Sequence, residues 1–192
     1  MKSKIILCTG GARSGKSEFA ERLSLSYTGK KAYVATGQAF DNEMRDRIAK
    51  HKARRGIEWN NFEIPYDLHG YWQQISNDSD IILIDCLTMF TTNHMLNFGS
   101  IENQDDANHL ESQIMEHIHN LLQDIKQSHN KVIIFVTNEI GLGIVPDNKL
   151  ARYFRDIAGR VNREVATAAD QVYLTISGVT IELKSQEAHI DG

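Results

Sequence analysis

The chain has 192 residues; 41% of them are hydrophobic, 24% are charged, and the formal net charge is −4. These values are typical of a globular protein with a buried core, and the acidic balance argues against a nucleic-acid partner. No apolar run reaches the roughly 18 residues that a membrane span needs and no signal peptide precedes the first apolar run, so we expect a cytoplasmic protein without membrane insertion.

The first predicted strand, residues 4–9, runs directly into a glycine-rich turn and then into a helix predicted over 16–27. The turn has the spacing of a P-loop, in which glycines let backbone N–H groups surround phosphate oxygens without Cβ clashes. Lys16 brings a positive charge to the β- and γ-phosphates, and Ser17 offers a hydroxyl to Mg²⁺. The sequence therefore predicts a nucleoside triphosphate site made of Gly10, Gly11, Ala12, Arg13, Ser14, Gly15, Lys16 and Ser17.

A second predicted strand, 31–35, precedes a helix predicted over 42–54 that contains a strongly basic segment. Residues 47–55 hold six basic side chains in an otherwise acidic chain, and His51 is one of them. A histidine in such a segment is usually a solvated surface residue. The segment also suits a second phosphate, and a neutral imidazole, which the neighbouring positive charges favour, is a competent nucleophile toward phosphorus. The residues alone leave both interpretations open.

Two acidic residues are further candidates for the same site. Asp85 follows the apolar run Ile81-Ile82-Leu83-Ile84, as in a Walker B strand, where the carboxylate holds Mg²⁺ near the P-loop. An aspartate that merely ends a strand has the same pattern. Glu63 can accept hydrogen bonds from a ribose or a base, and it can equally be an exposed strand carboxylate.

The rest of the chain continues the alternation of strands and helices. Further elements are predicted as strands over 80–84, 131–137, 171–176 and 179–183, and as helices over 66–76, 86–97, 107–128 and 147–169. Alternation of this kind predicts an α/β protein whose mostly parallel sheet carries helices on both faces. The short turn Ser177-Gly178 makes the last strand an antiparallel edge strand. We expect a surface loop over 98–106.

Two features near the last long helix suggest contacts with a ligand or another subunit. Residues 137–146 follow an apolar strand with polar residues and then glycines, as in a substrate or switch loop. The helix over 147–169 is rich in arginine, which suits either a solvated face or a binding surface. Gly159 lies inside it at a cost of about 1 kcal/mol relative to alanine, so we expect close packing there.

Together these segments closely resemble one family, the bifunctional adenosylcobinamide kinase/adenosylcobinamide-phosphate guanylyltransferases of cobalamin biosynthesis. A P-loop alone occurs in many protein families. The residues of this P-loop, combined with the Arg-Ile-x-x-His element and the Asn-Glu-Ile-Gly-x-Gly-Ile-Val-Pro loop, are specific for this family. Gly56 stands where relatives often have proline, and residues 93–106 match weakly. The matching segments are 9–17, 33–36, 43–52, 85–88, 137–146 and 155–162.

The resemblance implies a RecA-like P-loop domain over 1–184, with a loose tail over 185–192, and a homotrimer. It implies that ATP or GTP phosphorylates adenosylcobinamide, and that GTP then transfers GMP to adenosylcobinamide-phosphate with Mg²⁺ as cofactor. It places His51 at the position of the nucleophile that forms a GMP–histidine intermediate, and Ser17 and Asp85 at the metal. The implied nucleotide contacts are Gly10–Ser17, Ala35, Thr36, Gly37, Lys52, Ala53, Arg54, Arg55, Glu63 and Asp85.

Two other functions are compatible with a P-loop. The first is a one-step small-molecule kinase, in which His51 acts only through its charge. The second is a non-enzymatic, RecA-like regulatory nucleotide-binding module, which would bind and slowly hydrolyse nucleotide without any dependence on a corrinoid. Detection of nucleotide label bound covalently to His51 would distinguish the guanylyltransferase from both of these functions.

Overall fold

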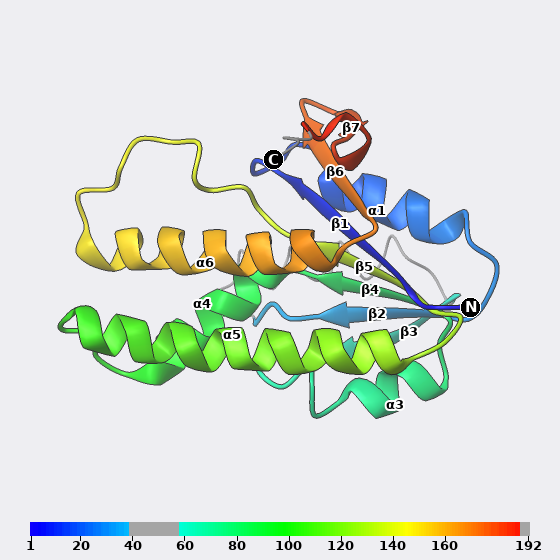
Figure 1. Ribbon diagram of the computed structural model, residues 1–192, viewed down its shortest axis with the longest axis horizontal. Coiled ribbons are helices and arrows are strands. Elements are labelled where there is room, and N and C mark those ends of the chain that lie inside the picture. The colour runs from blue at the N-terminus through cyan, green and yellow to red at the C-terminus, as the bar shows by residue number, and fades with distance from the viewer. Residues whose placement is uncertain (39–57, 189–192) are drawn as a thin grey trace.

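The computed structural model describes residues 1–38 and 58–188, and within these ranges the chain is built on one seven-stranded sheet (Figure 1). The strands lie in the order β3-β2-β4-β5-β1-β6-β7. Neighbours are parallel except for β6 and β7, which confirms the antiparallel edge strand. Their bounds are β1 Lys4–Gly10, β2 Lys31–Ala35, β3 Trp59–Glu63, β4 Ile81–Asp85, β5 Val132–Val136, β6 Gln171–Ile176 and β7 Val179–Glu182.

Every strand predicted from an apolar run is present, with ends that differ by at most one residue. Strand β3 was not among the strands predicted from apolar runs. Only Trp59 in it is buried, and Asn60 and Asn61 are exposed, because β3 is an edge strand that pairs with β2 alone. An edge strand lacks the continuous apolar run that marks a strand buried on both faces.

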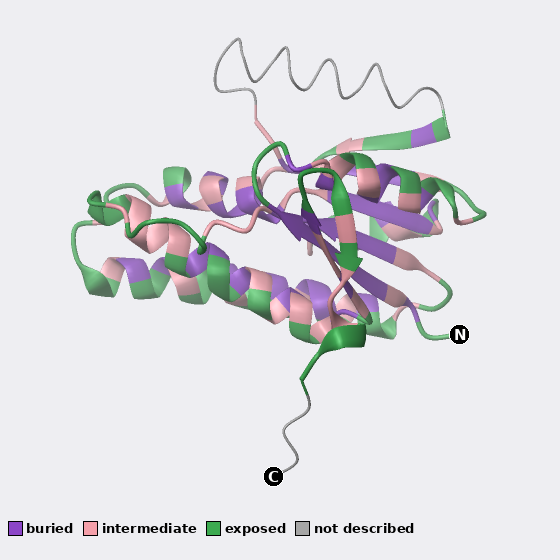
Figure 2. Ribbon diagram, turned by 90° about the horizontal axis from the view of Figure 1, so that it is seen from above, coloured by how far each residue is buried: buried purple, intermediate pink, exposed green. Residues whose placement is uncertain are grey.

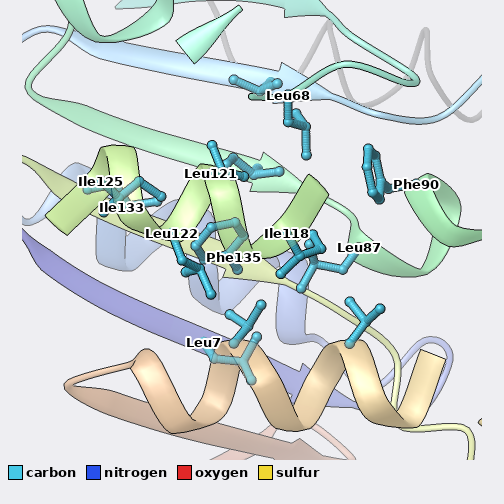
Figure 3. Close-up of a cluster of buried hydrophobic side chains, with 14 of the residues drawn as sticks. Leu7, Leu68, Leu87, Phe90, Ile118, Leu121, Leu122, Ile125, Ile133 and Phe135 are labelled. Atoms are coloured by element: carbon cyan, nitrogen blue, oxygen red, sulfur yellow. The ribbon is translucent and has the colours of Figure 1, made fainter. Parts of the chain in front are cut away.

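Helices cover both faces of the sheet, as predicted. Ala20 of α1 packs on one face with residues such as Ile6 and Leu83, whereas α4, α5 and α6 pack on the other with residues such as Leu7 and Ile133 (Figure 1). The larger helices on this second face enclose the cluster shown in Figure 3. The described helices are α1 Lys16–Leu25, α3 Trp72–Asn77, α4 Leu87–Phe98, α5 Gln104–Gln127 and α6 Lys149–Ala168.

Burial follows the expected amphipathic pattern. The central strands are buried almost throughout, and the helices alternate between buried and exposed residues (Figure 2). In α5 the apolar residues from Leu110 to Ile125 repeat with the helical period and form a stripe that is buried against the sheet. Burial of such a stripe is the main source of helix stability in a protein of this size.

Two predicted helices begin at other residues than expected, and one expectation about packing is wrong. Helix α5 begins at Gln104, inside the predicted loop 98–106, because Asn103 and Asp106 form a capping box at its start. The predicted helix 66–76 is helical only from Trp72, since its first residues form a turn in which Asp67 accepts a hydrogen bond from the Gly70 N–H. Gly159 is exposed and no atom described lies within 4 Å of the position of its missing Cβ. The predicted helix 42–54 lies outside the described residues.

A histidine cluster joins the segment after β3 to α4 and α5. The His69 N–H donates to Nε2 of His117 at 3.1 Å, and the His69 ring contacts Asp124 at 2.7 Å. The His94 and His117 ring centroids lie 5.9 Å apart. Burial, and then the neighbouring His94, lowers the pKa of His117 from its usual 6.5 to about 4, while Asp67 opposes this and His69 adds to it.

We expect this cluster to make the protein less stable in mild acid. Because the pKa of His117 is lower in the folded state, the unfolded chain takes up its proton first, and stability falls as pH drops from about 6.5 to about 4. The loss from this one group is on the order of 3 kcal/mol. Urea unfolding measured across this pH range should show it. In His117→Gln, which keeps an acceptor for His69, the unfolding free energy should depend less on pH, whereas the exposed His119→Gln should show the same pH dependence as wild type. An equal pH dependence in wild type and both variants would contradict the role given to His117.

Candidate nucleotide-binding site

The predicted site residues that the structure describes lie at the carboxyl ends of the parallel strands, where ligands bind in open α/β sheets. The glycine-rich loop joins β1 to α1. Gly10 has φ 152° and Gly15, the residue before α1, has φ 96°, both in the region that favours glycine. A Cβ on Gly10 would overlap the Thr175 carbonyl oxygen of β6 and lie 2.8 Å from Ser14 Oγ. The loop therefore passes closer to β6 than any other residue type allows.

The side chains of this loop are already arranged for an anion. Lys16 is 7% exposed, and its Nζ donates to the Gly11 carbonyl oxygen at 3.0 Å. The hydroxyls of Thr9 and Ser14 are buried and have no hydrogen-bond partner within residues 1–38 and 58–188. The N-terminus of α1 adds backbone N–H groups and the positive end of the helix dipole. Buried donors without a protein partner beside a lysine fit a bound phosphate chain.

Asp85 ends β4, and one strand, β5, separates it from the P-loop strand. The Tyr33 hydroxyl donates to Asp85 Oδ2 at 2.9 Å, which orients the carboxylate from the neighbouring strand. The predicted metal ligands, this carboxylate and the half-buried Ser17 hydroxyl, are oxygen donors of the kind that Mg²⁺ takes in nucleotide sites. The residues present thus fit the metal that the sequence predicts.

The cysteine next to Asp85 does not supply a nucleophile. Burial, and then the charge of Asp85, raises the pKa of the Cys86 thiol to about 12, although Lys16 opposes this shift. Its Sγ accepts a hydrogen bond from the Met89 N–H and caps α4. The pKa of the buried Cys8 is raised to about 12 for the same two reasons. Both thiols are therefore expected to stay protonated at neutral pH.

The second group of predicted nucleotide contacts lies beside Asp85. Ala35 ends β2 and is paired with Asp85 on one side and with Glu63 on the other. Thr36 is buried, Gly37 is half-buried and the Glu63 side chain is exposed. Because β3 lies four strands from β1, Glu63 is roughly 19 Å from the P-loop strand. That span separates the predicted phosphate contacts of the P-loop from the predicted contact at Glu63.

A polar network that the sequence did not predict joins the strand ends on the P-loop side. Thr137 donates to Asn162 Oδ1 at 2.7 Å, and Asn162 Nδ2 donates to the Asn138 carbonyl oxygen at 3.0 Å. The Asn138 N–H donates to Thr88 Oγ1 at 2.8 Å. The next residue, Glu139, donates its N–H to the Gly10 carbonyl oxygen at 3.1 Å. The start of the predicted substrate loop is therefore attached to the P-loop.

The remaining predicted site residues lie outside the described part of the chain. They are the proposed nucleophile and the basic residues that follow it: His51, Lys52, Ala53, Arg54 and Arg55.

Comparison with known proteins agrees with the resemblance. The family model described as "Cobinamide kinase / cobinamide phosphate guanyltransferase" matches residues 6–183. The chain is 39% identical over 182 residues to the bifunctional adenosylcobalamin biosynthesis protein CobU of Escherichia coli (strain K12), covering 94% of this chain and 99% of that protein. It is 41% identical to the protein of the same name from Salmonella typhimurium, with the same coverage. Its identity to the CobP protein of Pseudomonas aeruginosa is 36%, covering 94% of this chain and 97% of the relative.

Solved structures support the fold. An ATPase from the type III secretion system of pathogenic bacteria superposes with a TM-score of 0.58 at 10% identity; the match covers 98% of this chain and 59% of the longer ATPase. The fold is thus that of the RecA-like P-loop proteins. Among the helices in residues 1–38 and 58–188, none has the length and apolar character that a membrane span requires. With a family model over nearly its whole length and three relatives above 35% identity, the chain belongs to the cobinamide kinase/cobinamide phosphate guanyltransferase family.

Proposed function

We propose that this chain phosphorylates adenosylcobinamide with ATP or GTP, and then transfers GMP from GTP to adenosylcobinamide-phosphate through a GMP–His51 intermediate. The observation that carries the proposal is that the P-loop with Lys16 lies along the same row of strand carboxyl ends as Asp85, Ala35 and Glu63, in which these last three are level with one another. Family membership supports the pair of reactions over a one-step kinase or a regulatory module.

At the phosphate end of the site, the protein supplies charge and fixed donors. Lys16 neutralises the β- and γ-phosphates, and the N–H groups of residues 10–17 hold the phosphate oxygens in place. Asp85 and Ser17 would hold Mg²⁺, which would neutralise charge on the phosphates. Phosphoryl transfer depends chiefly on such positioning and charge neutralisation.

At the nucleoside end, the predicted contacts are Ala35–Gly37 and Glu63. The distance of Glu63 from the P-loop strand suits a hydrogen bond to the ribose or the base rather than a contact with phosphate. Lys52–Arg55 are proposed as further nucleotide contacts on the evidence of the family resemblance.

The second reaction is proposed to be two displacements at the α-phosphorus. A neutral His51 nitrogen attacks it, a P–N bond forms, and the P–O bond to pyrophosphate breaks. An oxygen of adenosylcobinamide-phosphate then attacks the same phosphorus, the P–N bond breaks, and His51 is regenerated. The covalent step lets a bulky corrinoid enter after pyrophosphate has left.

The same proposal includes a single catalytic domain over 1–184, a cytoplasmic location and a homotrimer. The exposed apolar side chains of the loop after β5 support an association of subunits, because Leu142 is 86% exposed and Ile144 is 96% exposed. Sedimentation at micromolar concentration tests the assembly directly.

The decisive experiment traps the intermediate. Protein is incubated with Mg²⁺ and GTP labelled at the α- or the γ-phosphate, denatured, and examined for label that is lost in acid and kept in base. Wild type should carry α-label and no γ-label, because GMP and not phosphate is attached. His51→Ala should carry none, and the exposed His119→Ala should be labelled like wild type.

Two results would count against this function. A folded wild type that binds GTP but takes up no α-label would remove the covalent route and leave the one-step kinase. Absence of label together with nucleotide hydrolysis that adenosylcobinamide does not change would favour the regulatory module.

A further inference from the structure

Asn93 is a polar residue in the middle of α4 whose side chain is completely buried, with 0% exposure. Its Nδ2 donates two hydrogen bonds, to the Thr36 carbonyl oxygen at 2.7 Å and to the Pro65 carbonyl oxygen at 3.0 Å. Thr36 directly follows β2, and Pro65 lies two residues after Glu63 at the end of β3. One amide on a helix therefore holds the carboxyl ends of two neighbouring strands.

The strand end at Thr36 is also joined to the residues around Asp85. The Thr36 hydroxyl donates to the Cys86 carbonyl oxygen at 2.7 Å and accepts from the Cys86 N–H at 2.8 Å. The Thr36 N–H donates to the Asp85 carbonyl oxygen at 3.1 Å. The segments that follow β2 and β3 are linked a second time by the Tyr66 hydroxyl, which donates to Gln38 Oε1 at 3.1 Å. At their carboxyl ends, the spacing of β2, β3 and β4 is thus set by side-chain hydrogen bonds as well as by the backbone hydrogen bonds between the strands.

In the described part of the chain, the Asn93 amide forms hydrogen bonds through its nitrogen but not through its oxygen. Its Oδ1 is buried and has no hydrogen-bond partner among the residues that the structure describes. A buried carbonyl oxygen without a partner opposes folding, and asparagine is a poor residue for a helix interior. A residue that costs stability in two ways is expected where its two donors serve the site.

We propose that Asn93 is a positioning residue for the nucleoside part of the nucleotide. It does not touch the ligand. It fixes the Thr36 and Pro65 carbonyl oxygens and so holds Ala35–Gly37 and Glu63 at the separation that the base and ribose require. This inference rests on the proposed function only in taking those residues as nucleotide contacts. The two hydrogen bonds of Asn93 do not involve the P-loop, which therefore keeps its own geometry.

The test compares two substitutions inside α4. Asn93→Leu keeps the size of the side chain and removes both donors. Thr91→Val is the matched control, because Thr91 is also fully buried in α4, but within residues 1–38 and 58–188 its hydroxyl donates to the Leu87 carbonyl oxygen of the same helix alone. Folding is followed by circular dichroism and thermal melting, and GTP binding by calorimetry.

We expect Asn93→Leu to weaken GTP binding about tenfold or more, equivalent to roughly 1.4 kcal/mol. Inorganic tripolyphosphate, which can contact only the P-loop end, should bind the variant and wild type alike. Thr91→Val should lower the melting temperature and bind GTP like wild type. At saturating GTP, the amount of α-label on Asn93→Leu should reach the wild-type level, because the reacting groups are unchanged.

Three outcomes would overturn the inference: unchanged GTP affinity in Asn93→Leu, equal weakening of GTP and tripolyphosphate, or equal weakening in Thr91→Val. If Asn93→Leu does not fold, Asn93→Ala, which leaves room for water beside the two carbonyls, undergoes the same comparison. Failure of the proposed function is separate, since it would appear as missing label on wild type while the ratio of GTP affinities remains measurable.

Discussion

Gly10→Ala should destroy the nucleotide site and destabilise the protein as well. The new methyl group would overlap the Thr175 carbonyl oxygen, which belongs to the neighbouring strand β6 and cannot move without distorting the sheet. The positive φ of Gly10 adds strain for alanine. We expect a loss of about 3 kcal/mol in the free energy of unfolding and GTP affinity reduced at least about 100-fold. Thermal melting and calorimetry measure the two effects.

Gly11→Ala is the matched control for stability. It lies one residue further along the same loop, is exposed, and has no described atom within 4 Å of the position of its missing Cβ. Its unfolding free energy should stay within about 0.5 kcal/mol of wild type. Equal destabilisation by the two substitutions would mean that the close approach to β6 is not what requires glycine at position 10.

Lys16→Ala should abolish both reactions while leaving the protein folded. Its ammonium group is the buried positive charge of the loop, and both reactions need the triphosphate neutralised in the same place. We expect kcat/KM for each reaction to fall about 1,000-fold, which corresponds to about 4 kcal/mol of transition-state stabilisation. Circular dichroism and thermal melting check that the variant is folded.

The control for charge is Lys30→Ala. Lys30 is exposed and directly precedes β2, at the opposite end of the sheet from the P-loop, so both activities should remain within about twofold of wild type. Activity of Lys16→Ala within tenfold of wild type would contradict the role given to this residue. Loss of only one of the two reactions would show that they use the triphosphate differently.

The features that were predicted correctly depend on residues close together in the sequence. The P-loop needs only a strand, eight consecutive residues and a helix, so its spacing is sufficient to identify it. The buried strands were predicted because each is a short apolar run between polar segments, and α5 because its stripe repeats with the helical period. Even so, its capping box was missed, although Asn103 and Asp106 are visible in the sequence.

Other features that were missed depend on neighbours in space. Strand β3 forms at the sheet edge by pairing with β2, and its own residues carry little apolar signal. Glycine is required at position 10 because of a carbonyl oxygen 165 residues away in sequence, at Thr175. Gly159 was expected to be closely packed, but it is exposed. A glycine inside a helix lowers the helix propensity of the segment, and this alone does not indicate a close neighbour.

By itself the sequence determined the family, the P-loop, the order of most strands along the chain and the candidate residues, because these follow from local spacing and apolar periodicity. Only the tertiary structure decided that Ala35 lies level with both Glu63 and Asp85, because register and strand order depend on how distant segments pack. It alone also showed that Asn93 reaches carbonyl groups 57 and 28 residues away. Such contacts cannot be predicted from local sequence, because the sequence around an asparagine in a helix does not show whether its side chain faces water or bonds to two strand ends.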